Sequence, residues 1–230
     1  MVIRRTWRLL RRLWRGVVRA LLALAALAVG LVILFRWVNP PPGYVMIAER
    51  IRLGGIERDW VPLAAMSSNL PLSAAAAEDA NFCRHWGFDI EGIRAAIADS
   101  DRLRGGSTIS QQVAKNVFLW PARSWVRKGL EAGFTVLIEV LWPKRRIMEV
   151  YLNVAEMGEG VFGAEAAARH FWRTGAADLG PQRAARLMAV LPDPQGRSPV
   201  SGSAFIARRG SAIQKGAATI REDGRGACFL

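Results

Sequence analysis

A run of 16 residues without a polar side chain lies near the N-terminus, at Ala20–Phe35, "ALLALAALAVGLVILF". As an α-helix it is about 24 Å long, a little short of a hydrocarbon core of about 30 Å. An arginine and a tryptophan flank it on each side, namely Trp14, Arg19, Arg36 and Trp37. Both residue types reach into the headgroup region of a bilayer. We therefore expect one transmembrane anchor over residues 20–38.

The residues around this run predict that it is retained and set its orientation. The following "FRWVNPPP" offers no small residues of the kind that signal peptidase cleaves after. Before the run come seven arginines and no acid: Arg4, Arg5, Arg8, Arg11, Arg12, Arg15 and Arg19. Arginine-rich flanks stay in the cytoplasm, so everything after Asn39 is expected on the opposite side of the membrane.

The same basic stripe could bind nucleic acid, because the chain carries a net charge of +13. An apolar run follows it directly, which is typical of a topology and lipid-headgroup signal. We therefore expect membrane lipids and no nucleic acid as partners. Only two cysteines and two histidines occur, which disfavours a structural zinc site. A Cys83–Cys228 disulfide is conceivable outside the cytoplasm, but two unpaired thiols are the simpler expectation.

Beyond the anchor the pattern is mainly helical. "NPPPG" at Asn39–Gly43 predicts a stiff break, and Tyr44–Leu53 has the alternating, β-branched character of a short strand. Helical periodicity begins at Pro71, Met157–Gly163 reads as a flexible loop, and the residues after Ser201 as a weakly helical tail that frays. We divide the chain into a basic segment (1–19), an anchor (20–38), a linker region (39–70), a mainly helical domain (71–200) and a tail (201–230).

The first stretch with chemical character is "EDANFCRHWGFD", which begins at Glu78 inside a predicted helix. Glu78, Phe82 and His85 would share one helical face, with Asp79 about 100° away. Two acids near a helix start could simply complement its dipole. The functional interpretation makes Glu78 a general base or acid in a cleft, with Phe82 and His85 packed beneath it. Asp79 would then tie the helix to neighbouring backbone.

The second stretch is "GGSTISQQVAKN", Gly105–Asn116. A helix beginning near Ser107 would place four polar side chains within about 100° of arc. They are Thr108, Gln111, Gln112 and Lys115. The glycines precede a helix N-terminus, which favours anions, but no lysine follows them as in a nucleotide-binding P-loop. An extended polar groove for an anion is the better interpretation.

The third stretch is "RSWVRKGLEAGFTVLIE", from Arg123 to Glu139. Arg127 and Lys128 lie four and three residues before Glu131, a spacing typical of an ordinary exposed salt-bridged turn. Together with Lys115 and Arg123, however, these cations would suffice to neutralise a diphosphate. Glu78 would then accept a hydroxyl proton.

Four motifs in order, "EDANFCRHWGFD", "GGSTISQQVAKN", "RSWVRKGLE" and "KRRIMEVYLN", resemble those of family 51 glycosyltransferases. The similarity covers about Ala75–Pro192 and is greatest to the free-standing peptidoglycan glycosyltransferases of Gram-negative bacteria. No Ser-x-x-Lys or Lys-Thr-Gly motif of a transpeptidase occurs. The resemblance implies a mainly α, lysozyme-like helical lobe with a small membrane-proximal jaw and one N-terminal transmembrane helix. It also implies polymerisation of lipid II into β-1,4-linked glycan with inversion and release of undecaprenyl diphosphate.

The resemblance also implies roles for individual residues. Glu78 matches the general base, and Glu131 matches a second essential carboxylate that places the donor diphosphate or its metal. The donor-site positions are Ser107, Gln112, Lys115, Arg123, Arg127 and Lys128. Supporting positions are Asp79, Phe82, His85 and Asn116, and Glu149 matches a structural position. A divalent cation, Mg²⁺ or Mn²⁺, is compatible with the family; no organic cofactor is implied.

Lipid II, the growing glycan chain and other cell-wall synthesis or division proteins are the partners that the resemblance implies. The location would be the bacterial inner membrane, with the N-terminus cytoplasmic and the catalytic domain periplasmic. Two alternatives remain open at this point. A muramidase or lytic transglycosylase shares a helical lobe with one glutamate, but it needs no diphosphate site. An inactive membrane-tethered scaffold is disfavoured because every catalytic-motif residue is present.

Overall fold

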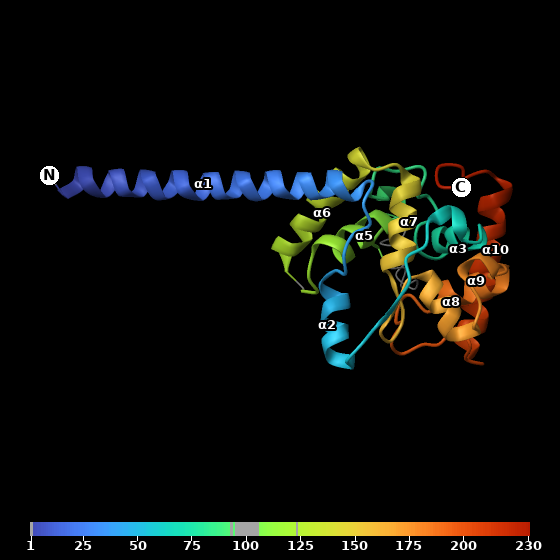
Figure 1. The fold of residues 1–230 in the computed structure, drawn as a ribbon. Helices are drawn as coiled ribbons and strands as arrows, with labels where there is room; N and C mark the ends of the chain where they lie inside the picture. Colours follow the sequence, from blue (N-terminus) through green and yellow to red (C-terminus); the bar gives the residue numbers. More distant parts are fainter. Residues whose placement is uncertain (1, 93, 95–105, 123) are drawn as a thin grey trace. The chain divides into compact units, whose positions relative to one another are not determined.

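The computed structural model describes residues 2–92, 94, 106–122 and 124–230, which form two compact units, Met1–Asn39 and Pro40–Leu230 (Figure 1). The first unit is one helix, α1 (Val2–Phe35), so the basic segment continues the anchor helix. Within α1, Leu10–Phe35 is long and apolar enough to cross a membrane. The expected apolar anchor is therefore a helix, which begins well before residue 20.

The second unit is mainly helical, as expected. Its α-helices are α2 (Tyr44–Leu53), α3 (Asn69–Glu78), α5 (Ile109–Phe118), α6 (Trp125–Leu141), α7 (Lys144–Val154), α8 (Ala164–Trp172), α9 (Pro181–Ala189) and α10 (Ala204–Glu222). Two 3₁₀ turns are η1 (Leu63–Ala65) and η2 (Ala176–Asp178), and the strands are β1 (Glu57–Arg58), β2 (Glu156–Gly158) and β3 (Val161–Phe162). Helices α3, α5 and α8 surround α7, whose side chains at Met148 and from Val150 to Asn153 are buried.

Polar side chains on buried α7 bind the chain that leads into η1. Asn153 accepts a hydrogen bond from the Val61 backbone N–H and donates one to its carbonyl, each at 2.9 Å. Glu149 accepts from the Leu63 N–H at 2.8 Å. Because buried polar groups need such partners, these contacts fix the segment before α3 against the core. They agree with a structural role for Glu149.

Residues 157–163, for which the sequence predicts a flexible loop, form part of a small sheet of order β1-β3-β2. Strand β1 pairs in parallel with β3, and β2 pairs antiparallel to β3. Met157, Val161 and Phe162 are buried, and Gly160 takes the positive φ of 70° that the tight turn requires. The expectation was wrong because the parallel partner, β1, lies about a hundred residues away in the sequence.

Tyr44–Leu53 is helix α2 and not the expected strand. Gly43 lets the chain approach α5 closely, because a Cβ there would lie 2.1 Å from the Asn116 carbonyl oxygen. Buried Met46 lies on α2, and the helix ends at Gly54 in the left-handed region. Local β propensity is a weak preference, and packing on α5 outweighs it.

The C-terminal residues do not fray. Helix α10 lies beside α9 and α3 (Figure 1). Cys83 and Cys228 form a disulfide, so the expectation of two free thiols was also wrong. Phe229 is 1% exposed and lies 6.0 Å from Phe82, between ring centroids. Both expectations failed because a tail of weak periodicity gains its order from distant partners.

Candidate active site

Glu78 is the last residue of α3, where the helix ends because Asp79 adopts φ −159°. The expected face shared by Glu78, Phe82 and His85 is therefore wrong, since the latter two lie in turns beyond the helix. Glu78 Oε2 accepts a hydrogen bond from Gln112 Nε2 at 2.9 Å, and its side chain is 16% exposed. Burial raises the pKa of Glu78, although the Gln112 amide and nearby cations act in the opposite direction.

Asp79 holds the loop after α3 to the start of α5. One carboxylate oxygen lies 2.7 Å from His85 Nε2, and the other accepts from the Ile109 backbone N–H at 3.1 Å. Ile109 is the first residue of α5, so a buried carboxylate lies at that helix N-terminus. These contacts agree with the tie to neighbouring backbone that the sequence analysis expected of Asp79.

Phe82 and His85 pack against a polar network from α5, α6 and α7. Lys144 donates to the His85 carbonyl oxygen at 2.8 Å, and its ammonium lies 4.3 Å from the centre of the Phe82 ring. The same lysine pairs with Glu139 at 2.8 Å, and Glu139 accepts from Ser110. Side chains from α5, α6 and α7 thus hold the loop that follows Glu78.

Helix α5 begins one residue later than expected, with Thr108 as its N-cap. Thr108 and Gln111 form a capping box, and the Thr108 hydroxyl also donates to the Gly87 carbonyl at 2.6 Å. Gln111 is consequently buried and engaged in the cap, and does not lie in the polar groove. Ser107 precedes the cap, and Gln112 with Lys115 forms the groove side of α5.

Lys115 interacts electrostatically with both Glu78 and Glu131. Its side chain reaches solvent but is flanked by protein, and this partial burial lowers its pKa. The charges of Glu131 and Glu78 act in the opposite direction, while Arg127 and Lys128 lower the pKa further. Lys115 therefore lies within electrostatic reach of both Glu78 and the cluster on α6.

Helix α6 begins at the cap of Ser124, which accepts from the Arg127 N–H at 3.1 Å. Arg127 binds one oxygen of Glu131 at 2.6 Å and Lys128 binds the other at 2.5 Å. Glu131 is 3% exposed, so this is not the ordinary exposed turn. Burial by itself raises the pKa of Glu131, but the hydrogen bonds from Lys128 and Arg127 outweigh it and the pKa is lowered.

Two further sequence predictions remain to be placed. Asn116 lies in the last turn of α5, where its backbone carbonyl contacts Gly43. Arg123 lies outside the described residues. Of the positions that the resemblance assigns to the donor site, Gln112 binds Glu78, Lys115 lies within electrostatic reach of Glu78 and Glu131, and Arg127 with Lys128 binds Glu131.

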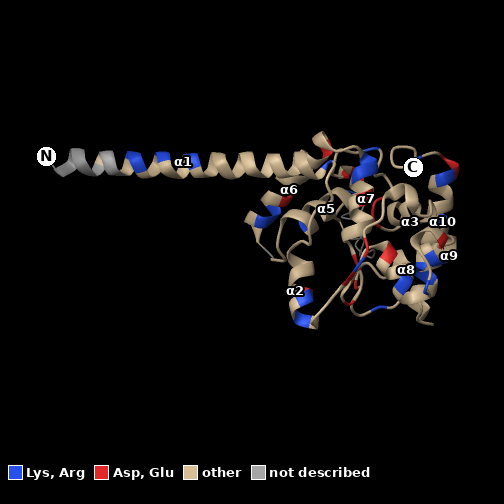
Figure 2. Ribbon diagram, in the orientation of Figure 1, with Lys and Arg blue, Asp and Glu red and all other residues tan. Residues whose placement is uncertain are grey.

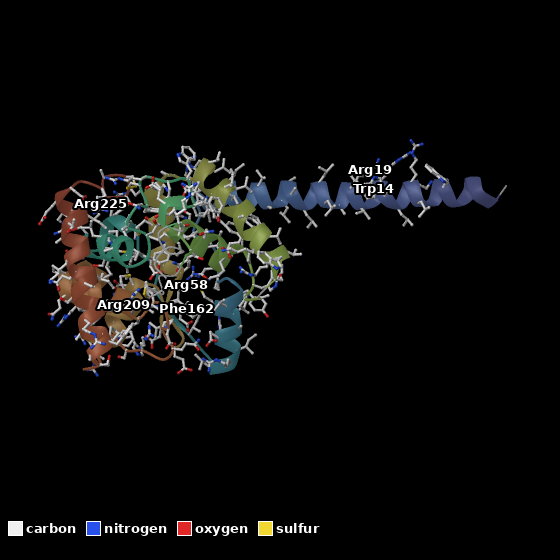
Figure 3. The ribbon with its side chains drawn as sticks, turned by 180° about the vertical axis from the view of Figure 1, so that it is seen from behind. Trp14, Arg19, Arg58, Phe162, Arg209 and Arg225 are labelled. Carbon is white, nitrogen blue, oxygen red and sulfur yellow. A yellow bond between two sulfur atoms is a disulfide. The ribbon has the colours of Figure 1, made fainter. Side chains whose placement is uncertain are left out.

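Sequence reasoning missed Arg209. This residue comes from α10 (Figure 3), and its Nη2 lies 3.6 Å from Glu78 Oε1, opposite the Gln112 contact. The only signal was a pair of arginines soon after Ser203, which caps α10. Nothing in the sequence indicates that this helix packs against α3.

The chain is similar to known proteins over most of its length. A family model described as transglycosylase matches residues 46–218, which include most of α10. A biosynthetic peptidoglycan transglycosylase of Jannaschia sp. (strain CCS1) is 54% identical to this chain. The match covers 94% of this chain and 90% of that protein. Proteins with the same name are 51% identical in Rhodospirillum centenum (95% of this chain and 96% of that one) and 47% in Caulobacter vibrioides (96% and 98%).

Proposed function

The chain belongs to the transglycosylase family and is a peptidoglycan glycosyltransferase, and from this premise we propose which of its side chains carry the reaction. Its second unit is the lysozyme-like helical domain of that family. The substrates are lipid II and the growing glycan chain. The glycan-cleaving and inactive-scaffold alternatives are not retained, because the relatives are named as biosynthetic enzymes.

The reaction joins two lipid-linked chains. The 4-hydroxyl of the acceptor GlcNAc attacks the anomeric carbon of the donor MurNAc, and the bond from that carbon to the diphosphate oxygen breaks. The hydroxyl proton passes to a base, and undecaprenyl diphosphate leaves with the bonding electron pair. The reaction thus needs one carboxylate base and fixed positive charge some distance from it.

Glu78 is the proposed base, and the burial of its carboxylate is the observation that supports this proposal. A carboxyl whose pKa is raised by burial retains a proton more readily than an exposed one, so it is a stronger base once ionised. Gln112 orients one oxygen by its hydrogen bond. Asp79, Phe82 and His85 hold the following loop and support this position.

The cations beyond Glu78 are proposed to bind the donor diphosphate. Three of these cations, Lys115, Arg127 and Lys128, are among the described residues. The family motif also assigns Arg123 and Ser107 to the donor site. Glu131 acts on the donor through the two cations that it holds, because both of its oxygens accept from them. Fixed charges of this kind stabilise a leaving group without reorganising during the reaction.

The described carboxylates do not fit a divalent cation at Glu131. Both Glu131 oxygens are occupied by Arg127 and Lys128, and the described residues hold no group of three His, Cys, Asp or Glu that could bind a metal. No step is therefore assigned to Mg²⁺ or Mn²⁺. Polymerisation assayed with a chelator and then with added metal tests this directly.

The N-terminal apolar helix suits a membrane anchor, and we propose that residue 1 is cytoplasmic and the second unit periplasmic. The described arginines of α1 lie toward its N-terminus, and the rest of the helix carries no charge as far as Phe35 (Figure 2). The Cys83–Cys228 disulfide supports the same orientation, because disulfides persist in oxidising compartments. Protease added to spheroplasts should degrade the second unit and spare an N-terminal tag.

Membrane lipids are also proposed to contact the second unit itself. Helix α2 exposes Tyr44, Ile47 and Ile51 at helical spacing, and α6 exposes Trp125 and Val126 at 93% and 74%. Apolar groups of this size with arginines nearby in the sequence are typical of surfaces that bind a bilayer. Cell-division and other cell-wall proteins remain proposed partners on family grounds only.

Purified full-length protein incubated with lipid II tests the proposal. Wild type should form glycan polymer and leave preformed glycan intact. Glu78→Gln should polymerise about 10²–10⁴-fold more slowly, while Glu222→Gln, an exposed glutamate on α10, should match wild type. Polymerisation by Glu78→Gln at the wild-type rate would show that the base has been assigned to the wrong residue.

A further inference from the structure

The C-terminal residues contact the loop that directly follows the proposed base. Cys228 is joined to Cys83, and the Phe229 ring packs on Phe82. Arg225 also lies 3.4 Å from the Ala80 carbonyl, within hydrogen-bond distance. These contacts fall on residues 80, 82 and 83, within five positions of Glu78. The chain end therefore adjoins the active-site loop.

The same C-terminal region reaches Glu78 from a second direction. Helix α10 packs closely on α3, because a Cβ added at Gly216 would lie 3.2 Å from the Ala76 side chain. From this helix Arg209 approaches the Glu78 carboxylate at 3.6 Å. Its Nε is buried and has no hydrogen-bond partner among the described residues, so the polar contact of this guanidinium is the one to Glu78. The distance from Arg209 to Glu78 thus depends on how α10 packs on α3.

We propose that residues 204–230 act as a clamp that positions Glu78, and that the Cys83–Cys228 disulfide keeps this clamp closed. Transglycosylase activity is then sensitive to the redox state of the disulfide. The proposal rests on the proposed role of Glu78 as the base. Reduction would separate the loop after Glu78 from the C-terminal residues, so that α10 and its Arg209 are held less closely to Glu78. Asp79 and Lys144 would still hold the loop itself.

The segments that the disulfide joins have little other regular structure. Residues 79–89 and 223–230 are turns and bends, without a helical or strand hydrogen-bond ladder. Segments of this kind open locally far more easily than packed helices. A covalent bond between them therefore adds a restraint to the turn hydrogen bonds and side-chain contacts that hold each segment.

The disulfide is also within reach of a reductant. It lies in a shallow surface hollow of about 330 Å³, beside Arg84, Asp223 and Arg225. A dithiol attacks one sulfur, forms a mixed disulfide, and then closes to its own disulfide. Two electrons and two protons pass to the protein, leaving the thiols of Cys83 and Cys228, and the dithiol is oxidised.

The test compares oxidised and dithiol-treated full-length enzyme in detergent, with lipid II as substrate. Thiol alkylation and mass spectrometry establish how many thiols are free. Reduction should lower kcat by roughly ten- to a hundredfold, the range expected when a catalytic group is misplaced by up to about 1 Å. Reoxidation should restore it. The double variant Cys83→Ser/Cys228→Ser should show the reduced rate and no response to the dithiol.

The pH profile separates positioning from general stability. The charge of Arg209 lowers the pKa of Glu78, so its withdrawal should move the acid limb of the rate profile to higher pH. Arg209→Ala should produce the same shift in the oxidised enzyme, and Arg208→Ala, its exposed neighbour, should not. Circular dichroism of each sample measures the folded fraction.

Two outcomes would overturn the clamp. One is a fully reduced enzyme that polymerises at the oxidised rate with the same acid limb. The other is a rate that falls only in proportion to the folded fraction, which would make the disulfide a stabilising link alone. Either result leaves the base assignment intact, because that assignment depends on Glu78→Gln. An active Glu78→Gln would instead remove the premise.

Discussion

At the scale of single residues, the proposed role of Glu78 as the base makes its protonation the limit on activity at acid pH. Burial raises its pKa above the ordinary value of 4.5, and the base works only when ionised. The rate on lipid II should therefore fall as pH is lowered through a value above 4.5. Initial rates of polymerisation across pH measure this limb. A limb at or below 4.5 would contradict the inferred desolvation.

The same shift has a consequence for stability. A raised carboxyl pKa means that the folded state binds the proton more tightly than the unfolded state, so this contribution to stability is lost as pH rises through the folded pKa. Glu78→Gln removes the buried charge and should fold at neutral pH at least as stably as wild type. Thermal melting thus serves as the control that separates lost catalysis from lost folding.

Lys115 should control the basic side of the activity. Although its side chain is exposed to solvent, desolvation by the surrounding protein lowers its pKa below 10.5, so the ammonium loses its charge at a lower pH than a free lysine. Lys115→Ala should reduce kcat by about 10²–10³, the usual cost of removing one charge-stabilising donor. Lys115→Arg should keep part of the rate and lose the basic limb, since a guanidinium stays charged.

The matched control for these variants is Lys215→Ala, which removes an exposed lysine of α10. It should leave both kcat and the pH profile unchanged. A Lys115→Arg enzyme that retained the basic limb would show that another group titrates there. The donor-site assignment would then rest on Arg127 and Lys128.

At the scale of elements, the start of α5 determines where the groove residues lie. The Thr108 hydroxyl caps this helix and also binds the Gly87 carbonyl, so it joins α5 to the active-site loop. Thr108→Ala should cost about 1–2 kcal/mol and lower Tm by roughly 2–8 °C. Activity should fall as well, because Gln112 follows one turn later. Calorimetry and the polymerisation assay measure the two effects.

Thr108→Ser keeps the hydroxyl and is the matched control for this helix start. It should remain within about 0.5 kcal/mol of wild type, as conservative changes that preserve a cap do. Equal stability of the Ala and Ser variants would mean that the capping box contributes nothing measurable. The position of Gln112 would then depend on packing of α5 against α6 and α7 alone.

At the scale of the whole molecule, the second unit should fold and act without the first. Deleting residues 1–38 should leave a second unit that unfolds cooperatively and polymerises lipid II in detergent at a similar kcat. In vesicles the deleted form should need roughly 10²-fold more protein for the same rate, because anchoring raises the local concentration of enzyme at the substrate. Circular dichroism and vesicle assays test the two parts.

Replacing Ala20–Phe35 by leucines of equal number is the control for the anchor. Its function as an anchor depends on length and apolarity, so this variant should keep wild-type activity in vesicles. A loss of activity there would mean that specific side chains of the span contribute contacts. The loss of activity on deleting residues 1–38 would then include the loss of those contacts as well as of the anchor.

Much of this protein follows from its sequence alone. Apolar length specifies the anchor, and helical periodicity predicts a mainly α domain. The family resemblance predicts that Glu78, Lys115 and Glu131 belong to one site. The anchor and the helices follow from neighbours within one or two helical turns, and such short-range patterns determine burial and local charge directly.

The tertiary structure decided what depends on distant partners. Tyr44–Leu53 became a helix by packing on α5, and residues 157–163 became strands by pairing with β1. The chain end became ordered by joining Cys83, and Arg209 reached Glu78 from a helix that begins more than a hundred residues later. Non-local contacts outweigh weak local propensity, because burial and covalent links contribute more free energy than a residue's own conformational preference.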